Sequence, residues 1–90
     1  MEVYWQMLRK GQRLILSTDQ GQLEEIGGVR ETKKGLDAFA KTFGYDPGRA
    51  QKGIPSMEEA KDFVESFRPW EMYGVSGEVG VDPQVRPEAV

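Results

Sequence analysis

The sequence predicts an α+β fold: a small antiparallel sheet, built from an N-terminal hairpin plus one or two further strands, covered on one face by two helices. Two observations support this prediction. Apolar residues alternate at strand period in the first twenty residues, and they recur at helical period over residues 32–43 and 56–67. Each helix is too short to be stable alone in water, so we expect both to pack on the sheet.

The hairpin is predicted over residues 3–18. Val3, Trp5 and Met7 occupy alternate positions of the first strand, and apolar residues return at 14–16. Gly11 supplies the positive φ that a short connection between the strands needs. A third strand over residues 22–26 is expected to stop at the glycine pair 27–28.

A first helix is predicted over residues 32–43, with Thr32 as its N-cap and Gly44 as its C-terminal cap. Its apolar side chains fall at i, i+3, i+4 and i+7, which places them on one stripe. They are Leu36, Phe39, Ala40 and Phe43. The glycines and proline of residues 45–54 then indicate a loop.

The second helix has a clearer beginning, because Ser56 and Glu59 match a capping box. Pro69 is expected to end this helix near Phe67 or Arg68, since the residue before a proline disfavours helical dihedrals. Residues 70–75 alternate in a way that allows a further strand. Residues 76–90 lack large apolar side chains, so we predict a single domain over 1–75 and a flexible tail over 76–90.

The composition excludes several kinds of chemistry. The 90 residues contain neither histidine nor cysteine, which removes the commonest general base, the thiol nucleophile and the usual zinc ligands. The acidic residues between Glu58 and Glu65 match a solvated helix face better than a metal site. We therefore expect a non-catalytic protein without a cofactor or a bound metal; an enzyme would have to rely on Asp, Glu, Lys or Tyr alone. No apolar run approaches the roughly 20 residues needed to cross a bilayer, so we expect the protein to be cytoplasmic.

Part of the chain resembles known families. Residues 3–43 resemble the YegP-like small domains of unknown function, in which a Trp-bearing strand, a Gly turn, a second strand with Ile and Ser, and a Lys-containing helix follow one another. The matching residues are Trp5, Leu8, Gly11, Ile15, Ser17, Lys33 and Lys34. The same β-β-β-α order also resembles the arm-type DNA-binding domain of phage integrases. These resemblances imply a fold and, in the second case, a nucleic-acid partner.

The first functional hypothesis is a protein-interaction module, such as an accessory or inhibitor protein. Five aromatic residues lie outside the two helical stripes, and Trp and Tyr dominate interface hot spots. The predicted contact residues are Arg68, Trp70, Met72 and Tyr73. A larger protein or a second copy of this chain would bind there, unless a small core uses these rings as filler.

The alternative is a nucleic-acid-binding module. Residues 9–52 carry nine basic and six acidic side chains, whereas residues 53–90 carry three and eight, so a chain of net charge −3 has a basic N-terminal half. Arg30 belongs to this basic group, and the residues predicted to contact phosphates are Arg9, Lys10, Arg13, Lys33 and Lys34. Binding through phosphates would weaken steeply with salt.

Overall fold

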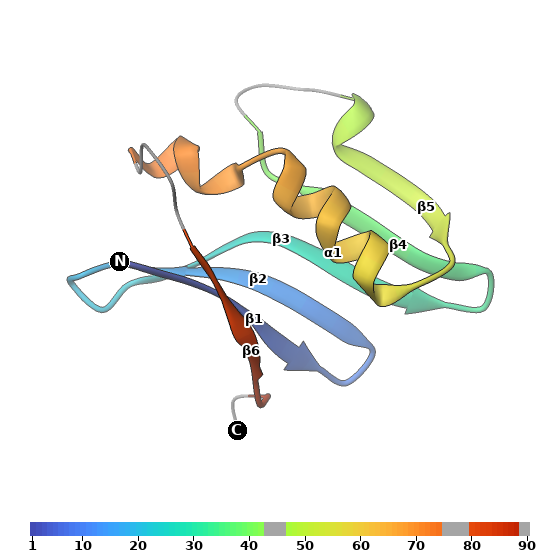
Figure 1. The fold of residues 1–90 in the computed structure, drawn as a ribbon, viewed down its shortest axis with the longest axis horizontal. Helices are drawn as coiled ribbons and strands as arrows, with labels where there is room; N and C mark the ends of the chain where they lie inside the picture. The colour runs from blue at the N-terminus through green and yellow to red at the C-terminus, as the bar shows by residue number, and fades with distance from the viewer. Residues whose placement is uncertain (43–46, 75–79, 89–90) are drawn as a thin grey trace.

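The computed structural model describes residues 1–42, 47–74 and 80–88 and shows one sheet of six strands with a single α-helix on one face (Figure 1). The strands are β1 (Glu2–Leu8), β2 (Gly11–Ser17), β3 (Leu23–Thr32), β4 (Gly35–Ala40), β5 (Ala50–Ile54) and β6 (Val81–Arg86). They lie in the order β5–β4–β3–β2–β1–β6. Neighbours from β5 to β1 are antiparallel, and β6 is parallel to β1. The prediction of two helices over a small antiparallel sheet is therefore wrong.

The N-terminal hairpin is confirmed. β1 and β2 pair in register from Glu2 opposite Ser17 to Leu8 opposite Gly11, and Gly11 has a φ of 142°. A Cβ at Gly11 would lie only 1.9 Å from a backbone oxygen of β3. Glycine is thus required there by both its dihedral angle and the close approach of the next strand.

The predicted first helix is a strand. Leu36, Ala38 and Ala40 alternate with Asp37 and Phe39 along β4, and the first set faces the core. The helical spacing misled because, over so few residues, an apolar set can satisfy both the 3.6 and the 2.0 period. Pairing of β4 with β3 and β5 on its two sides decides between them.

A tight turn replaces the expected start of that helix. Thr32 does not cap a helix; its hydroxyl donates to the carbonyl of Gly35 at 2.8 Å and accepts from the N–H of Lys34 at 3.2 Å. Gly35 has a φ of 118°, which a helix cannot use. Lys33 and Lys34 therefore lie at the tip of the β3–β4 hairpin. The expected cap Gly44 lies outside the described residues.

The third strand runs through the glycine pair instead of stopping at it. β3 continues to Thr32, and a bulge between its pairings with Leu14 and Ile15 accommodates one extra residue. A Cβ at Gly27 would lie 2.5 Å from Cγ1 of Val64 on the helix. Gly27 thus lets the helix pack closely against the sheet, so the absent side chain has a packing role inside the strand.

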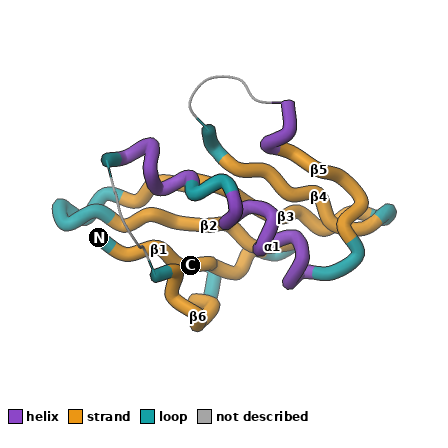
Figure 2. The backbone as a smooth tube through the Cα atoms, turned by 45° about the horizontal axis from the view of Figure 1, so that its top comes forward, coloured by secondary structure: helices purple, strands orange, loops and turns teal. Residues whose placement is uncertain are grey.

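The second predicted helix is confirmed as α1 (Met57–Ser66). Ser56 is its N-cap, and its hydroxyl accepts from the N–H of Glu59 at 3.1 Å. The helix ends at Ser66 with Phe67 as its C-cap, close to the end that Pro69 predicts. α1 packs on β3, β4 and β5, so one face of the sheet is covered there (Figure 2).

Three other segments differ from their predictions. Residues 45–54 were expected to be a loop, but they contain a 3₁₀ turn, η1 (Pro47–Arg49), and the edge strand β5. The alternation of residues 70–75 allowed a further strand, but Pro69–Tyr73 form a second 3₁₀ element, η2, and residue 75 lies outside the described residues. Both segments are short, and their structure depends on which distant strand or core surface they meet.

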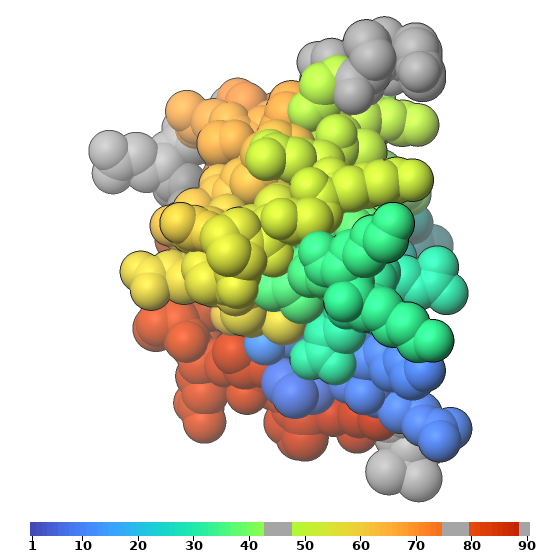
Figure 3. Space-filling view, turned by 90° about the vertical axis from the view of Figure 1, so that its right-hand side faces the viewer, coloured from blue at the N-terminus to red at the C-terminus, as the bar shows by residue number. Residues whose placement is uncertain are grey.

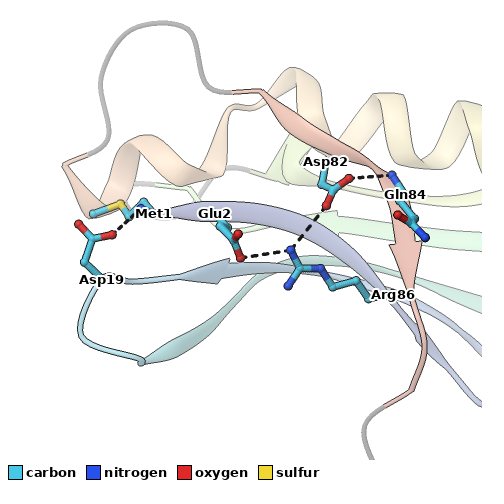
Figure 4. A network of polar contacts seen from close by, with 6 residues as sticks. All are labelled: Met1, Glu2, Asp19, Asp82, Gln84 and Arg86. Carbon is cyan, nitrogen blue, oxygen red and sulfur yellow. Dashed lines mark hydrogen bonds and ion pairs between the residues drawn. The ribbon is translucent and has the colours of Figure 1, made fainter.

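The C-terminal segment also belongs to the sheet. Residues 81–86 form β6, where an unstructured tail was predicted. Arg86 supports this strand by contacting Glu2 at 3.1 Å and Asp82 at 3.5 Å (Figure 4). Its guanidinium also lies 3.8 Å from the ring centroid of Tyr4. Cation–π and ionic contacts thus replace the large apolar side chains that the segment lacks.

The core lies between the sheet and α1. Trp5 is 1% exposed, and its indole N–H donates to Glu65 of α1 at 3.0 Å. The remaining buried apolar side chains come from all the strands except β6 and from α1 and η2; they include Val3, Leu14, Leu16, Ile26, Val29, Ile54, Val64 and Trp70. No helix in the described part of the chain is long and apolar enough to cross a membrane.

Candidate functional site

In the first candidate surface, Arg68 to Tyr73, only Pro69 and Trp70 are buried, and the other residues are half-buried or exposed. Trp70 is only 5% exposed, and Tyr73 packs partly buried against the same cluster while its hydroxyl lies 3.4 Å from Nζ of Lys41. Met72 is half-buried, and Arg68 pairs with Glu71 at 3.4 Å. The four predicted residues therefore do not form a shared exposed surface, because Trp70 is not accessible to a partner.

A different aromatic side chain faces solvent. Phe39 is 41% exposed, and within the described residues it is the one aromatic among the exposed large apolar side chains. It was predicted to line a buried helix stripe. Because Phe39 alternates with Ala38 and Ala40 on β4, it points away from α1, onto the face of the sheet that we call the open face.

Phe39 belongs to a row of residues that crosses the open face from strand to strand. The pairing places Gln6, Arg13, Gly28 and Phe39 opposite one another on β1, β2, β3 and β4. A Cβ at Gly28 would lie 2.8 Å from Cε1 of Phe39, so the ring rests across the bare backbone of that glycine. The ring therefore occupies the space that a side chain would fill.

Arg13 is held beside this row by polar contacts. Its Nε donates to the side-chain carbonyl of Gln6 at 2.7 Å, and a terminal nitrogen lies 3.7 Å from the carboxylate of Glu25. Gln6 is itself buried, so the arginine is anchored on a fixed acceptor. The side chain remains one-third exposed and can still donate to a ligand.

The other predicted basic residues lie at one end of the sheet. Arg9 and Lys10 form the β1–β2 turn, and Lys33 and Lys34 form the β3–β4 turn. The two turns lie at the same end because β2 and β3 run antiparallel, and the N–H of Glu31 donates to the carbonyl of Lys10 at 2.9 Å. Figure 3 faces this end and shows the blue β1–β2 turn, the green β3–β4 hairpin and the yellow-green β5 in succession.

Shallow hollows connect the basic end to Phe39. One, of about 380 Å³, is lined by Arg9, Lys10, Arg13, Gly28, Arg30 and Phe39, among others. A second, of about 240 Å³, shares Arg30 and Phe39 and adds Asp37 and Lys52. A third, of about 500 Å³, shares Asp37 and Lys52 and reaches Lys33 and Lys34. We call this continuous surface the basic track.

The basic track concentrates positive charge. It contains seven basic residues and three acidic residues, Glu25, Asp37 and Glu88, which gives a net charge of +4. The rest of this chain of net charge −3 therefore carries −7. Such a separation creates a local positive potential on an acidic protein and attracts a polyanion to one surface.

Other chemistry has little support. Among the described residues, no group of three acidic side chains is arranged to hold a metal ion. Of the predicted carboxylate run on α1, Glu65 instead accepts a hydrogen bond from Trp5. Burial lowers the pKa of Lys61, which lies 5.2 Å from the ring centroid of Trp5, while neighbouring Glu65 and Asp62 raise it in part. This lysine lies on the α1 side of the sheet, away from the basic track.

The sequence analysis did not identify two residues of the basic track, Phe39 and Lys52. Phe39 was assigned to the helix stripe, and Lys52 to a loop. The alternation of residues 36–40 was the signal that predicts an outward Phe39. No family model, curated protein or solved structure matches this chain, so the resemblance to YegP-like domains stays a prediction.

Proposed function

We propose that this chain is a non-catalytic, cytoplasmic domain that binds nucleic acid on the open face of its sheet. The observation that supports the proposal most is the basic track, which gathers seven of the twelve basic residues of an acidic chain beside an exposed aromatic ring. Phosphates of a nucleic acid would release counterions on binding such a surface, which supplies sequence-independent affinity.

The geometry favours this function over docking through residues 68–73. A partner that used Trp70 as an anchor would have to draw a ring that is 5% exposed out of the core, at a cost comparable to that of the core packing it loses. The basic track needs no such rearrangement, because its turn residues are already exposed.

The test is salt-dependent binding. Fluorescein-labelled single-stranded DNA of about 15 nucleotides is titrated by fluorescence polarisation between about 20 and 200 mM NaCl. We expect the affinity to fall steeply with salt. The triple variant Lys10→Gln, Lys33→Gln, Lys34→Gln should reduce the slope of log K against log salt by up to about 2, because each neutralised phosphate of a single strand contributes about 0.7 to that slope.

A charge-matched control separates the site from overall charge. The variant Lys41→Gln, Lys61→Gln, Arg68→Gln also removes three positive charges, but all three lie outside the basic track. We expect this control to retain most of the affinity and the salt slope. Equal losses in both variants, or no binding by the wild type at low salt, would contradict the proposal.

A further inference from the structure

We infer that the nucleic acid is single-stranded and that one of its bases stacks on Phe39. This inference rests on the proposed function and names the form of the ligand. Phe39 is 41% exposed, although the other aromatic rings of the described residues are buried or half-buried. An exposed aromatic on a basic surface is the element from which stacking platforms are built.

Gly28 determines how the ring lies. Cε1 and Cζ of Phe39 would be only 2.8 and 3.2 Å from a Cβ at Gly28, so the outer end of the ring rests on the backbone of β3. The side chain nevertheless stays 41% exposed, so part of it is accessible to a ligand. A ring that is supported from below loses little freedom when a base covers it, which favours stacking over a free side chain.

The charges around the ring match a nucleotide. Arg13 lies in the same cross-strand row as Phe39, on the far side of Gly28, and Arg30 lines the same two hollows as Phe39. A base stacked on Phe39 would therefore lie near the guanidinium groups of Arg13 on β2 and Arg30 on β3. The phosphates on either side of this base would pass through the two hollows that Arg30 lines. Arg13 is held in advance by Gln6 at 2.7 Å.

A duplex does not suit this surface. Inside a double helix each base is covered above and below by its neighbours, so its face cannot meet Phe39 unless the base is unstacked at a cost of a few kcal/mol. A single strand exposes its bases at a much lower cost. The inference is therefore specific: the open face distinguishes single strands by a stacked base and not by phosphates alone.

The experiment compares ligands that have the same phosphates but different bases. Wild-type protein is titrated with thymidine and uridine single strands of about 15 nucleotides, an abasic strand of that length, and a DNA duplex of that length. We expect the base-containing strands to bind about 5- to 150-fold more tightly than the abasic strand, as one stacked base would give. The two base-containing strands show whether DNA or RNA is preferred.

Variants of Phe39 then locate the effect. Phe39→Leu should lower the affinity for base-containing strands to that for the abasic strand and leave abasic binding unchanged. Phe39→Trp should retain the preference, and its added indole should be quenched by bound single strands. Leu23 is also an exposed apolar residue but lies on β3, so Leu23→Ala is the matched control and should leave the affinity for every ligand unchanged.

The outcomes separate the two claims. If the wild type binds abasic, single-stranded and duplex ligands equally, with a steep salt dependence, the stacking inference is overturned and phosphate binding stands. The same conclusion follows if Phe39→Leu keeps a preference for base-containing strands while folded by circular dichroism. If no ligand binds at low salt, the proposed function itself fails, and the inference fails with it.

Discussion

Replacing Gly27 by alanine should destabilise the protein through a single contact between β3 and α1. The added methyl would lie 2.5 Å from Cγ1 of Val64 and 3.1 Å from the carbonyl oxygen of Phe39, whereas carbon atoms in optimal contact are about 3.5 to 4.0 Å apart. The helix and the strand must therefore separate by about an ångström, in a region where Val64 is fully buried. Overpacking of this kind costs about 1 to 3 kcal/mol.

A compensating effect sets the net value. Alanine restricts the unfolded chain more than glycine does, which returns about 0.4 to 1 kcal/mol where the native dihedrals suit it. Taking the middle of each range, we expect a net loss of about 1.3 kcal/mol, which lowers the Tm by about 4 to 8 °C per kcal/mol for a domain of this size. Urea unfolding followed by the fluorescence of the buried Trp5 and Trp70 measures it.

The double variant Gly27→Ala, Val64→Ala tests the cause. Val64→Ala alone should cost about 2 kcal/mol, from two deleted methyl groups and a small cavity. In the double variant the new methyl occupies part of that space, so the combined loss should be at least about 1 kcal/mol smaller than the sum. Gly80→Ala, whose Cβ would meet nothing within 4 Å, is the control. Additive losses, or an unaffected Gly27→Ala, would refute the reasoning.

Four further outcomes follow from the packing. Trp70→Phe should cost less than about 1.5 kcal/mol, because the indole N–H has no hydrogen-bond partner among the described residues, whereas Trp70→Ala should cost about 3 to 5 kcal/mol by urea unfolding. Ser56→Ala removes the cap of α1 and should cost about 1 kcal/mol in the same assay. Arg86→Ala should speed amide hydrogen exchange in β6 while β2 remains protected. Burial lowers the pKa of Lys61 in the folded state below the unfolded value of 10.5, so between these two pH values the unfolded chain binds more protons than the folded one. The free energy of unfolding should therefore rise with pH in this window, and Lys61→Met should remove the rise when unfolding curves are measured across it.

Local signals account for the parts of the fold that the sequence predicted correctly. The hairpin depends on strand alternation and on one turn glycine, and α1 depends on a capping box and a following proline. In both cases each signal involves only residues that are near one another in the sequence, so neighbouring side chains suffice to specify the structure.

Non-local pairing explains the errors. Residues 36–40 fit a helix and a strand equally well until β3 and β5 lie on either side of them. Val81–Arg86 has too little apolar surface to indicate a strand, and it becomes one because β1 offers an edge and Tyr4 offers a ring for Arg86. Such partners are distant in sequence, so no window of the chain contains the information.

The same distinction applies to the candidate site. The charge distribution was enough to name the basic residues Arg9, Lys10, Arg13, Lys33 and Lys34. It could not reveal the surface that joins them, because the two turns meet at one end of the sheet only after four strands have paired. Phe39 was assigned to the core for the same reason that β4 was assigned to a helix. Because residues 36–40 were assigned a helical instead of a strand period, Phe39 was placed in the core and was not considered as a binding residue.

Phe39 has a structural task that must be distinguished from binding. Gly28 opposite it has no side chain, and an aromatic ring that covers such a glycine shields two strands from solvent. Covering requires only an apolar side chain of sufficient length, which leucine supplies at a cost below about 1.5 kcal/mol. Stacking requires a π face, which leucine lacks. The two tasks therefore give different results for one substitution: a cover alone predicts unchanged affinity in Phe39→Leu, whereas a platform predicts a folded protein that no longer distinguishes bases from bare phosphates.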